Sequence, residues 1–113
     1  MKSTNPRKIR SEQLNDRIHQ AARYVYAQQG NAWTVREVAE LAQTAPANVM
    51  FHAGRMTELE DAIIDQALKE PFDICNIKIL LRHYLATEEN GRVSRAMFLA
   101  LVERYTQRKE THV

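Results

Sequence analysis

Apolar residues recur every three or four positions along most of the chain, which is the period of an α-helix with one buried face. The pattern is clear from Ser11 to Gln29, where Ser11 is expected to cap the start of a helix and Gly30 to follow its end. The apolar positions of this segment are Leu14, Ile18, Ala21, Ala22 and Val25. The sequence therefore predicts a long first helix with one apolar side.

Two short helices separated by a tight turn are predicted next. Thr34 and Glu37 have the spacing of a capping box, so a helix is expected to open at Thr34. Pro46 suits the first turn of another helix, which should stop at Gly54. The expected inward-facing residues are Val35, Val38, Ala39 and Ala42 in the first short helix, and Val49, Met50 and Ala53 in the second.

Three more helices complete the predicted chain. Thr57 and Glu60 have capping-box spacing, and Pro71 should close or kink the helix that they begin. Two further helices are predicted, one over about 72–87 and one over about 93–109, with a turn at Asn90-Gly91 between them. Their expected inward residues are Leu59, Ala62, Ile63 and Ala67, and then Ile77, Leu80, Leu81, Tyr84 and Leu85. The six helices predict an all-α fold.

Composition supports this fold class and narrows the chemistry. Three glycines and three prolines in 113 residues are too few for the turns of a β-sandwich or for glycine-rich phosphate loops. The single cysteine, Cys75, excludes an internal disulfide and suits a reducing compartment, so we expect a cytoplasmic protein. The longest apolar run, 97–102, is too short to cross a bilayer, and we expect no membrane association.

Charge is distributed unevenly along the chain. The net charge is +2, but residues 1–56 carry +4 and residues 57–113 carry −2. The basic N-terminal half fits an anionic partner such as nucleic acid. Residues 1–10 are expected to form a flexible arm whose basic side chains contact DNA phosphates, or alternatively one that only keeps the chain in solution. These side chains are Lys2, Arg7, Lys8 and Arg10.

The two short helices and their turn, preceded by a longer helix, have the arrangement of a helix-turn-helix, in which the second short helix enters the major groove. Residues 17–68, which include RIHQAARYVYAQQG, TVREVAELAQTAPANVMFHAG and MTELEDAIIDQAL, resemble the DNA-binding domain of the tetracycline-repressor (TetR) family. That family has an alanine-rich first helix ending in glycine, and a threonine that opens the next helix. The matching residues are Ala21, Ala22, Gly30, Thr34, Val35, Val38, Ala39, Ala42 and Leu59.

The departures from the family pattern lie in the turn and in the second short helix. The usual glycine-valine-serine is replaced by Gln43-Thr44-Ala45, and tyrosine-x-tyrosine-phenylalanine is replaced by residues 50–53, MFHA. The familiar lysine after this helix is Met56. The resemblance implies that His52 faces the DNA backbone, whereas we expect Met50 to pack inside the domain.

Polar residues around the predicted turn are the candidate DNA-facing group. Asn48 and Gln43 carry the amide that can pair with adenine. Thr34, Arg36 and His52 are better placed to hold phosphates. Arg55 either adds a backbone contact or neutralises the carbonyl end of the helix. The predicted DNA-binding set is Thr34, Arg36, Gln43, Thr44, Pro46, Ala47, Asn48, Phe51, His52 and Arg55, with Lys2, Arg7, Lys8 and Arg10.

The C-terminal part of the chain predicts a dimer. TetR-like proteins normally continue into a large helical region that dimerises and often encloses a ligand, but only 45 residues follow Leu68. Residues 96–102 are apolar almost all the way round a helix, so a hairpin that pairs with a second copy is expected, and ligand sensing is not. The predicted interface is Leu80, Leu81, Tyr84, Met97, Leu101 and Tyr105.

These patterns divide the chain into a basic arm (1–10), a TetR-like DNA-binding region (11–70) and a dimerisation hairpin (71–113). The predicted function is a homodimeric, sequence-specific regulator of transcription, a repressor on a palindromic DNA operator. Four histidines without zinc-ligand spacing give no sign of an enzyme, a metal site or a cofactor. The alternative is a helical interaction module that keeps the helix-turn-helix shape and regulates through a protein partner.

Overall fold

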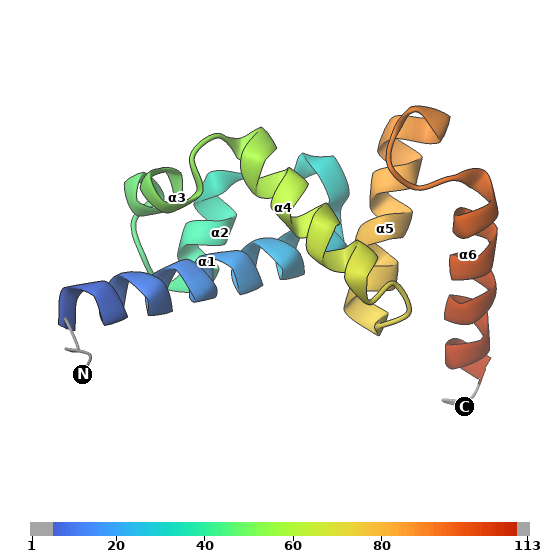
Figure 1. Cartoon of the computed structure of the whole chain (residues 1–113), viewed down its shortest axis with the longest axis horizontal. Helices are drawn as coiled ribbons and strands as arrows, with labels where there is room; N and C mark the ends of the chain where they lie inside the picture. The colour runs from blue at the N-terminus through green and yellow to red at the C-terminus, as the bar shows by residue number, and fades with distance from the viewer. Residues whose placement is uncertain (1–5, 111–113) are drawn as a thin grey trace, which may run out of the picture.

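The computed structural model describes residues 6–110, with side chains for residues 12–88 and 90–107, and this part of the chain contains six α-helices and no strand (Figure 1). The predicted all-α fold is confirmed. The helices are α1 (Pro6–Gln29), α2 (Val35–Ala42), α3 (Pro46–Ala53), α4 (Met56–Lys69), α5 (Ile74–Thr87) and α6 (Arg95–Glu110), with short 3-10 turns η1 (Gly30–Ala32) and η2 (Glu88–Asn90).

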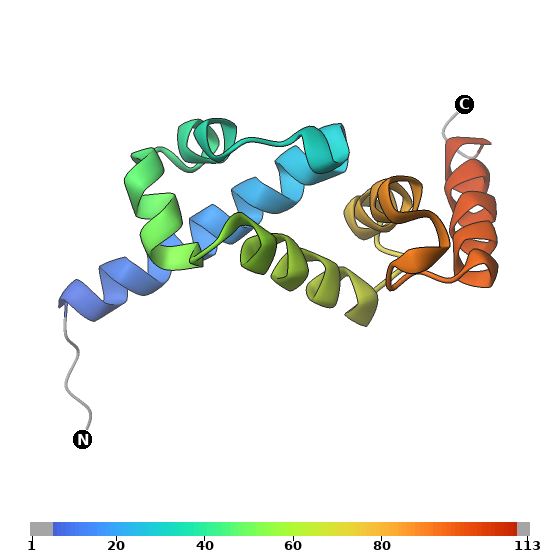
Figure 2. The same cartoon turned by 90° about the horizontal axis from the view of Figure 1, so that it is seen from above.

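Helix α1 is the central helix of an elongated molecule of 47 × 28 × 28 Å. Helices α2, α3 and α4 pack along it, α5 packs against both α1 and α4, and α6 packs mainly against α5. In both views α6 lies at the opposite end of the molecule from α3 (Figures 1 and 2). The fold thus separates a helix-turn-helix end from an α5–α6 hairpin end.

One continuous apolar core runs along α1. Ile18 and Ala22 of α1, Val38 of α2 and Val49 of α3 are completely buried, together with Ile63 of α4. The core continues into the hairpin through Ile77, Ile79, Leu80 and Leu101, which are also completely buried. Burial of this apolar surface is the main force that holds the six helices together.

Two helix starts differ from the prediction. Helix α1 begins at Pro6 rather than at Ser11, so the backbone of residues 6–10 is helical where a flexible arm was expected. Proline fits the first turn because its missing amide would have no helical partner there. Helix α4 begins at Met56, and the Arg55 backbone amide donates to a Glu58 oxygen at 2.7 Å. The predicted Thr57–Glu60 capping box is therefore wrong.

Two residues expected to face inward are exposed. Met50 of α3 is 39% exposed because Val49 alone fills the buried position of this short helix. Leu85 of α5 is 65% exposed, whereas Ile79 is buried because α5 is covered by α1, α4 and α6 on different sides. Short helices and helices with several neighbours therefore depart from a one-face pattern.

The predicted dimer set lies largely inside the chain. Leu80 and Leu101 are completely buried between the helices, so a second copy cannot contact them in this fold, and that part of the prediction is wrong. Tyr84 stacks on Phe98 with ring centroids 4.2 Å apart. The remaining predicted residues, Leu81, Met97 and Tyr105, are half-buried against the same core.

Three arginines fasten the hairpin to the rest of the molecule. Arg23 of α1 donates to Asn76 Oδ1 of α5 at 2.8 Å. Arg82 of α5 donates to the backbone oxygens of Ala27 at 3.4 Å and Gln28 at 2.6 Å, which closes the carbonyl end of α1. Arg92, just before α6, pairs with Asp61 and Asp65 of α4. The hairpin is therefore held at a defined position relative to α1 and α4.

Candidate nucleic-acid interface

Helix α2 opens with the predicted capping box. The Thr34 hydroxyl accepts from the Glu37 amide at 3.2 Å, and a Glu37 carboxylate oxygen accepts from the Thr34 amide at 3.0 Å. Gln29 also donates to Glu37 at 2.5 Å, and the hydrogen bonds from Gln29 and Thr34 lower the pKa of Glu37. The Thr34 hydroxyl is thus committed to the start of α2, where it supports the helix that precedes the turn.

The turn between α2 and α3 is held by its own backbone. The Thr44 amide donates to Ala39 O at 2.9 Å and the Gln43 amide donates to Glu40 O at 3.2 Å, which is the pairing of a Schellman motif. Gln43 has φ 60° and ψ 50°, the left-handed conformation that glycine usually supplies. Arg17 of α1 adds a bond from Nε to Ala42 O at 3.2 Å. The end of α2 and the first residues of the turn are therefore held by several independent bonds.

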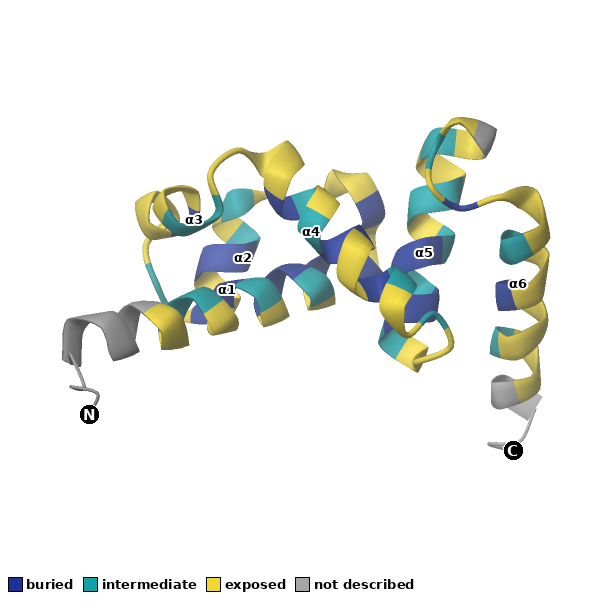
Figure 3. Cartoon of the chain, viewed as in Figure 1, coloured by how far each residue is buried: buried dark blue, intermediate teal, exposed yellow. Residues whose placement is uncertain are grey.

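Helix α3 is anchored on one side and open on the other. Val49 is completely buried, whereas Pro46, Ala47, Asn48 and Phe51 are exposed (Figure 3). The last of these is 84% exposed, an unusual setting for an aromatic side chain. The exposed side of α3 is thus free to enter a groove or meet another surface.

The Asn48 amide is already oriented in the free protein. Its Nδ2 donates to Thr44 Oγ1 at 2.8 Å. A carboxamide has two N–H donors and one oxygen acceptor, so this bond uses one donor and leaves the other donor and the oxygen available. That pair is the one a carboxamide uses to bind adenine. The turn and α3 therefore cooperate to present one oriented amide.

The charges on α3 and its flanking turns suit a polyanion, while Glu12 and Asp16 of α1 line a pocket together with His52. No acidic residue occurs between Leu41 and Thr57, a stretch that includes the whole of α3. Arg36 is exposed on α2, where it lies 3.9 Å from Glu40, and Arg55 is exposed just after α3. His52 is half-buried with its ring edge against Phe51, 5.4 Å between centroids.

The structure brings most of the predicted DNA-facing residues onto the helix-turn-helix end. Gln43, Thr44 and Asn48 are neighbours at the turn, and the other predicted residues of α2, α3 and the following turn flank them. The side chains of Lys2, Arg7, Lys8 and Arg10 lie outside the described residues. Sequence reasoning missed Arg17, since nothing in a single helix pattern shows that its side chain reaches the carbonyl end of α2.

Two observations bear on metal and thiol chemistry in the rest of the described chain. No group of three histidine, cysteine, aspartate or glutamate side chains is placed to hold a metal ion among these residues. Burial raises the pKa of the Cys75 thiol, which disfavours the reactive thiolate. No helix in this part of the chain combines the length and the apolar character needed to cross a membrane.

Comparison of the chain with protein-family models, with curated proteins and with solved structures gave no match.

Proposed function

We propose that the protein is a cytoplasmic, sequence-specific DNA-binding regulator of transcription, with α3 as its recognition helix. The observation that carries this proposal is the rigid turn before α3, which presents an oriented Asn48 amide on an exposed helix face. An α-helix fits the major groove, and a fixed carboxamide can distinguish adenine from the other bases there. The resemblance of residues 17–68 to TetR-like domains supports the same role.

Backbone contacts in this proposal come from the residues around α3. Arg36 and Arg55 would lie toward phosphates on either side of the groove, with His52 near the end of the helix. Phosphate contacts fix the position of a protein on DNA, while base contacts supply sequence preference. The absence of acidic residues along α3 avoids repulsion from the DNA backbone.

The proposed active form is a homodimer that pairs through the outer face of α6. Leu99 is 57% exposed and Val102 is 38% exposed on this helix, which packs mainly against α5. Two copies related by a twofold axis would present two recognition helices, and the operator would be a palindrome with half-sites about one helical turn apart. Occupation of such a site within a promoter would repress transcription.

Selection of bound sequences from a random duplex pool tests the proposal, because the pool contains every short operator and none has to be chosen in advance. Asn48→Ala should weaken binding to the selected duplex by about 1–3 kcal/mol and affect random DNA much less. Asn90→Ala, which removes an exposed amide in η2 outside both α3 and α6, is the matched control and should bind normally. If the pool yields no enriched sequence, or if Asn48→Ala weakens selected and random DNA equally, α3 does not read bases.

A second candidate function has one specific observation in its favour. Met50, Phe51 and Met56 are 39%, 84% and 40% exposed around α3, and exposed aromatic and methionine side chains are enriched at protein interfaces. The helix-turn-helix end would then bind a regulatory protein rather than DNA. Absence of any enriched duplex, together with loss of a captured protein in Phe51→Ala but not in Asn90→Ala, would favour this function.

A further inference from the structure

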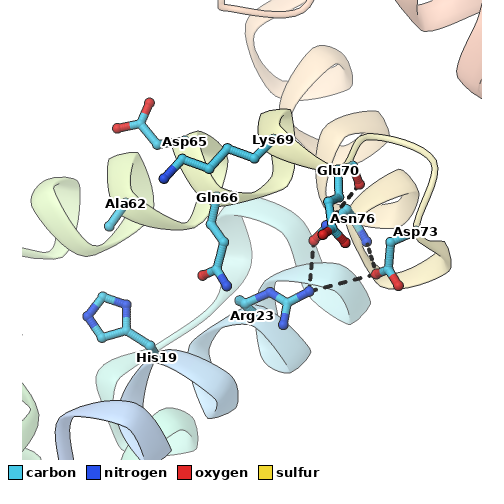
Figure 4. Close-up of a pocket in the computed structure, with 9 residues that line it drawn as sticks. All are labelled: His19, Arg23, Ala62, Asp65, Gln66, Lys69, Glu70, Asp73 and Asn76. Atoms are coloured by element: carbon cyan, nitrogen blue, oxygen red, sulfur yellow. Dashed lines mark hydrogen bonds and ion pairs between the residues drawn. The ribbon is translucent and has the colours of Figure 1, made fainter. Parts of the chain in front are cut away.

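A polar cavity of about 680 Å³ lies between α1, α4 and the beginning of α5, away from the proposed DNA-binding face (Figure 4). Every residue that lines it is polar except Ala62. Its volume is within the range of small-molecule sites, but most such sites are lined by apolar side chains. The charged groups of this lining favour a polar ligand, because a hydrophobic ligand would remove their water without giving them a partner.

Several charges at the cavity wall are already neutralised. Arg23 donates from Nη2 to Asn76 Oδ1 at 2.8 Å and lies 3.8 Å from Asp73. Asn76 is itself 4% exposed and donates to Glu70 O at 3.0 Å. Asp65 pairs with Arg92, which lies outside the cavity. These groups form a fixed wall that a ligand does not need to neutralise.

Donors and charges without a partner remain. Arg23 Nε is buried and has no hydrogen-bond partner among the described residues, a costly state for a guanidinium N–H. Lys69 and Glu70 have opposite charges, and within the described part of the chain neither side chain makes an ion pair. Gln66 has no hydrogen-bond partner there either.

The two unpaired charges are separated across the cavity. Figure 4 shows Lys69 extended back along α4 above Gln66, whereas Glu70 lies beside Asn76 and Asp73. A ligand with only a negative charge would meet repulsion from Glu70, and one with only a positive charge would meet repulsion from Lys69. A ligand with one charge of each sign at opposite ends meets an opposite charge at both.

We propose that this cavity binds a small extended zwitterion, with a carboxylate and an ammonium group joined by a short chain. The carboxylate accepts hydrogen bonds from Lys69 and from the Gln66 amide. The ammonium group donates to the Glu70 carboxylate. Hydrogen bonds between charged partners are stronger than those between neutral groups. Here the binding groups lie on α4 and at the residue that follows it. The site is independent of the proposed DNA contacts.

Titration of the full chain by NMR with three matched probes tests this site. The probes are δ-aminovalerate, valerate, which lacks the ammonium group, and n-pentylamine, which lacks the carboxylate. Saturable shifts at the amides around the cavity are expected for δ-aminovalerate, with binding about tenfold weaker, or about 1.4 kcal/mol, for each single-charge probe. The same titration with glycine, γ-aminobutyrate and ε-aminocaproate, whose two charged groups are closer together or farther apart, tests which ligand length fits the cavity.

Two variants of exposed residues complete the test without disturbing the core. Lys69→Met and Glu70→Gln should each weaken δ-aminovalerate binding about tenfold while the rest of the spectrum is retained. Lys69→Met should affect valerate but not pentylamine, and Glu70→Gln should do the reverse. The proposal is overturned if no zwitterion of the series binds saturably, if the single-charge probes bind as well, or if neither variant changes binding.

Discussion

Gln43 has a left-handed backbone conformation, which its β-carbon makes unfavourable. Glycine has no β-carbon, so Gln43→Gly should stabilise the protein. A left-handed conformation costs a residue with a β-carbon about 1–2 kcal/mol. The greater freedom of glycine in the unfolded chain offsets about 0.4–1 kcal/mol of that gain. The Gln43 side chain is exposed and makes no hydrogen bond within the described residues, so its removal costs no contact. The net gain should be about 0.5–1 kcal/mol.

Thermal and urea unfolding of the full chain measure this effect. A gain of this size should raise Tm by about 2–8 °C in a domain of this length. Gln43→Ala is the matched control, because it removes the same side chain but keeps the β-carbon and therefore the strain. Gly30→Ala is the reverse change. It should destabilise the protein, because Gly30 has φ +64° and a β-carbon there would lie 3.2 Å from Arg82 Cδ.

The expected order of stability is Gln43→Gly above wild type, Gln43→Ala close to wild type, and Gly30→Ala well below it. If Gln43→Ala stabilised the protein as much as Gln43→Gly, the backbone argument would be wrong. The glycine variant also bears on DNA binding, because an unchanged sequence preference would show that the Gln43 side chain reads no base.

Three further predictions concern the hairpin. Leu101→Ala should lower the free energy of unfolding by about 2–5 kcal/mol in urea titrations, because it leaves a cavity at a completely buried position. Leu99→Lys should leave that free energy nearly unchanged but shift light scattering toward the monomer, since 57% of this residue is exposed on the proposed dimer face. Burial lowers the pKa of His83, whose Nε2 accepts from the Arg92 amide at 3.1 Å, so the fold favours the neutral ring. Stability from His83 should be present above its ordinary pKa of 6.5 and be lost as pH falls toward its lower folded value, and His83→Gln should remove this loss.

Local signals predicted the bounds of α2 and α3 but misplaced the starts of α1 and α4. Thr34 with Glu37, Pro46 and Gly54 placed α2 and α3 correctly, because each acts on its own backbone within a few residues. The start of α4 was misplaced because Arg55–Glu58 and Thr57–Glu60 both have a spacing of three residues. Only the first pair forms the bond at the helix start. Glu60 instead accepts from Trp33 Nε1 at 3.3 Å, a contact across 27 residues that no local pattern shows.

The sequence showed that the candidate residues cluster around one turn, but not which bonds they make. Clustered polar residues around one turn identified Asn48 and Gln43, since both lie within one short segment. The Asn48–Thr44 bond and the reach of Arg17 to Ala42 depend on side-chain directions in the folded chain. Leu80 and Leu101 were wrongly placed in the dimer interface for a related reason. Apolar periodicity shows which residues are buried, but not whether the surface that covers them belongs to the same chain or to another.

Helix α1 contacts both the helix-turn-helix end and the α5–α6 hairpin end of the molecule. Arg17 bonds the end of α2 at the helix-turn-helix end, while Arg23 bonds Asn76 at the hairpin end. In the proposed homodimer, the separation of the two recognition helices is set by how the hairpin sits on α1 and α4. The cavity beside Arg23 lies at this junction, so a zwitterion bound there would change the surroundings of the Arg23–Asp73 pair without touching α3. Any influence on DNA binding would then act through half-site spacing rather than through base contacts.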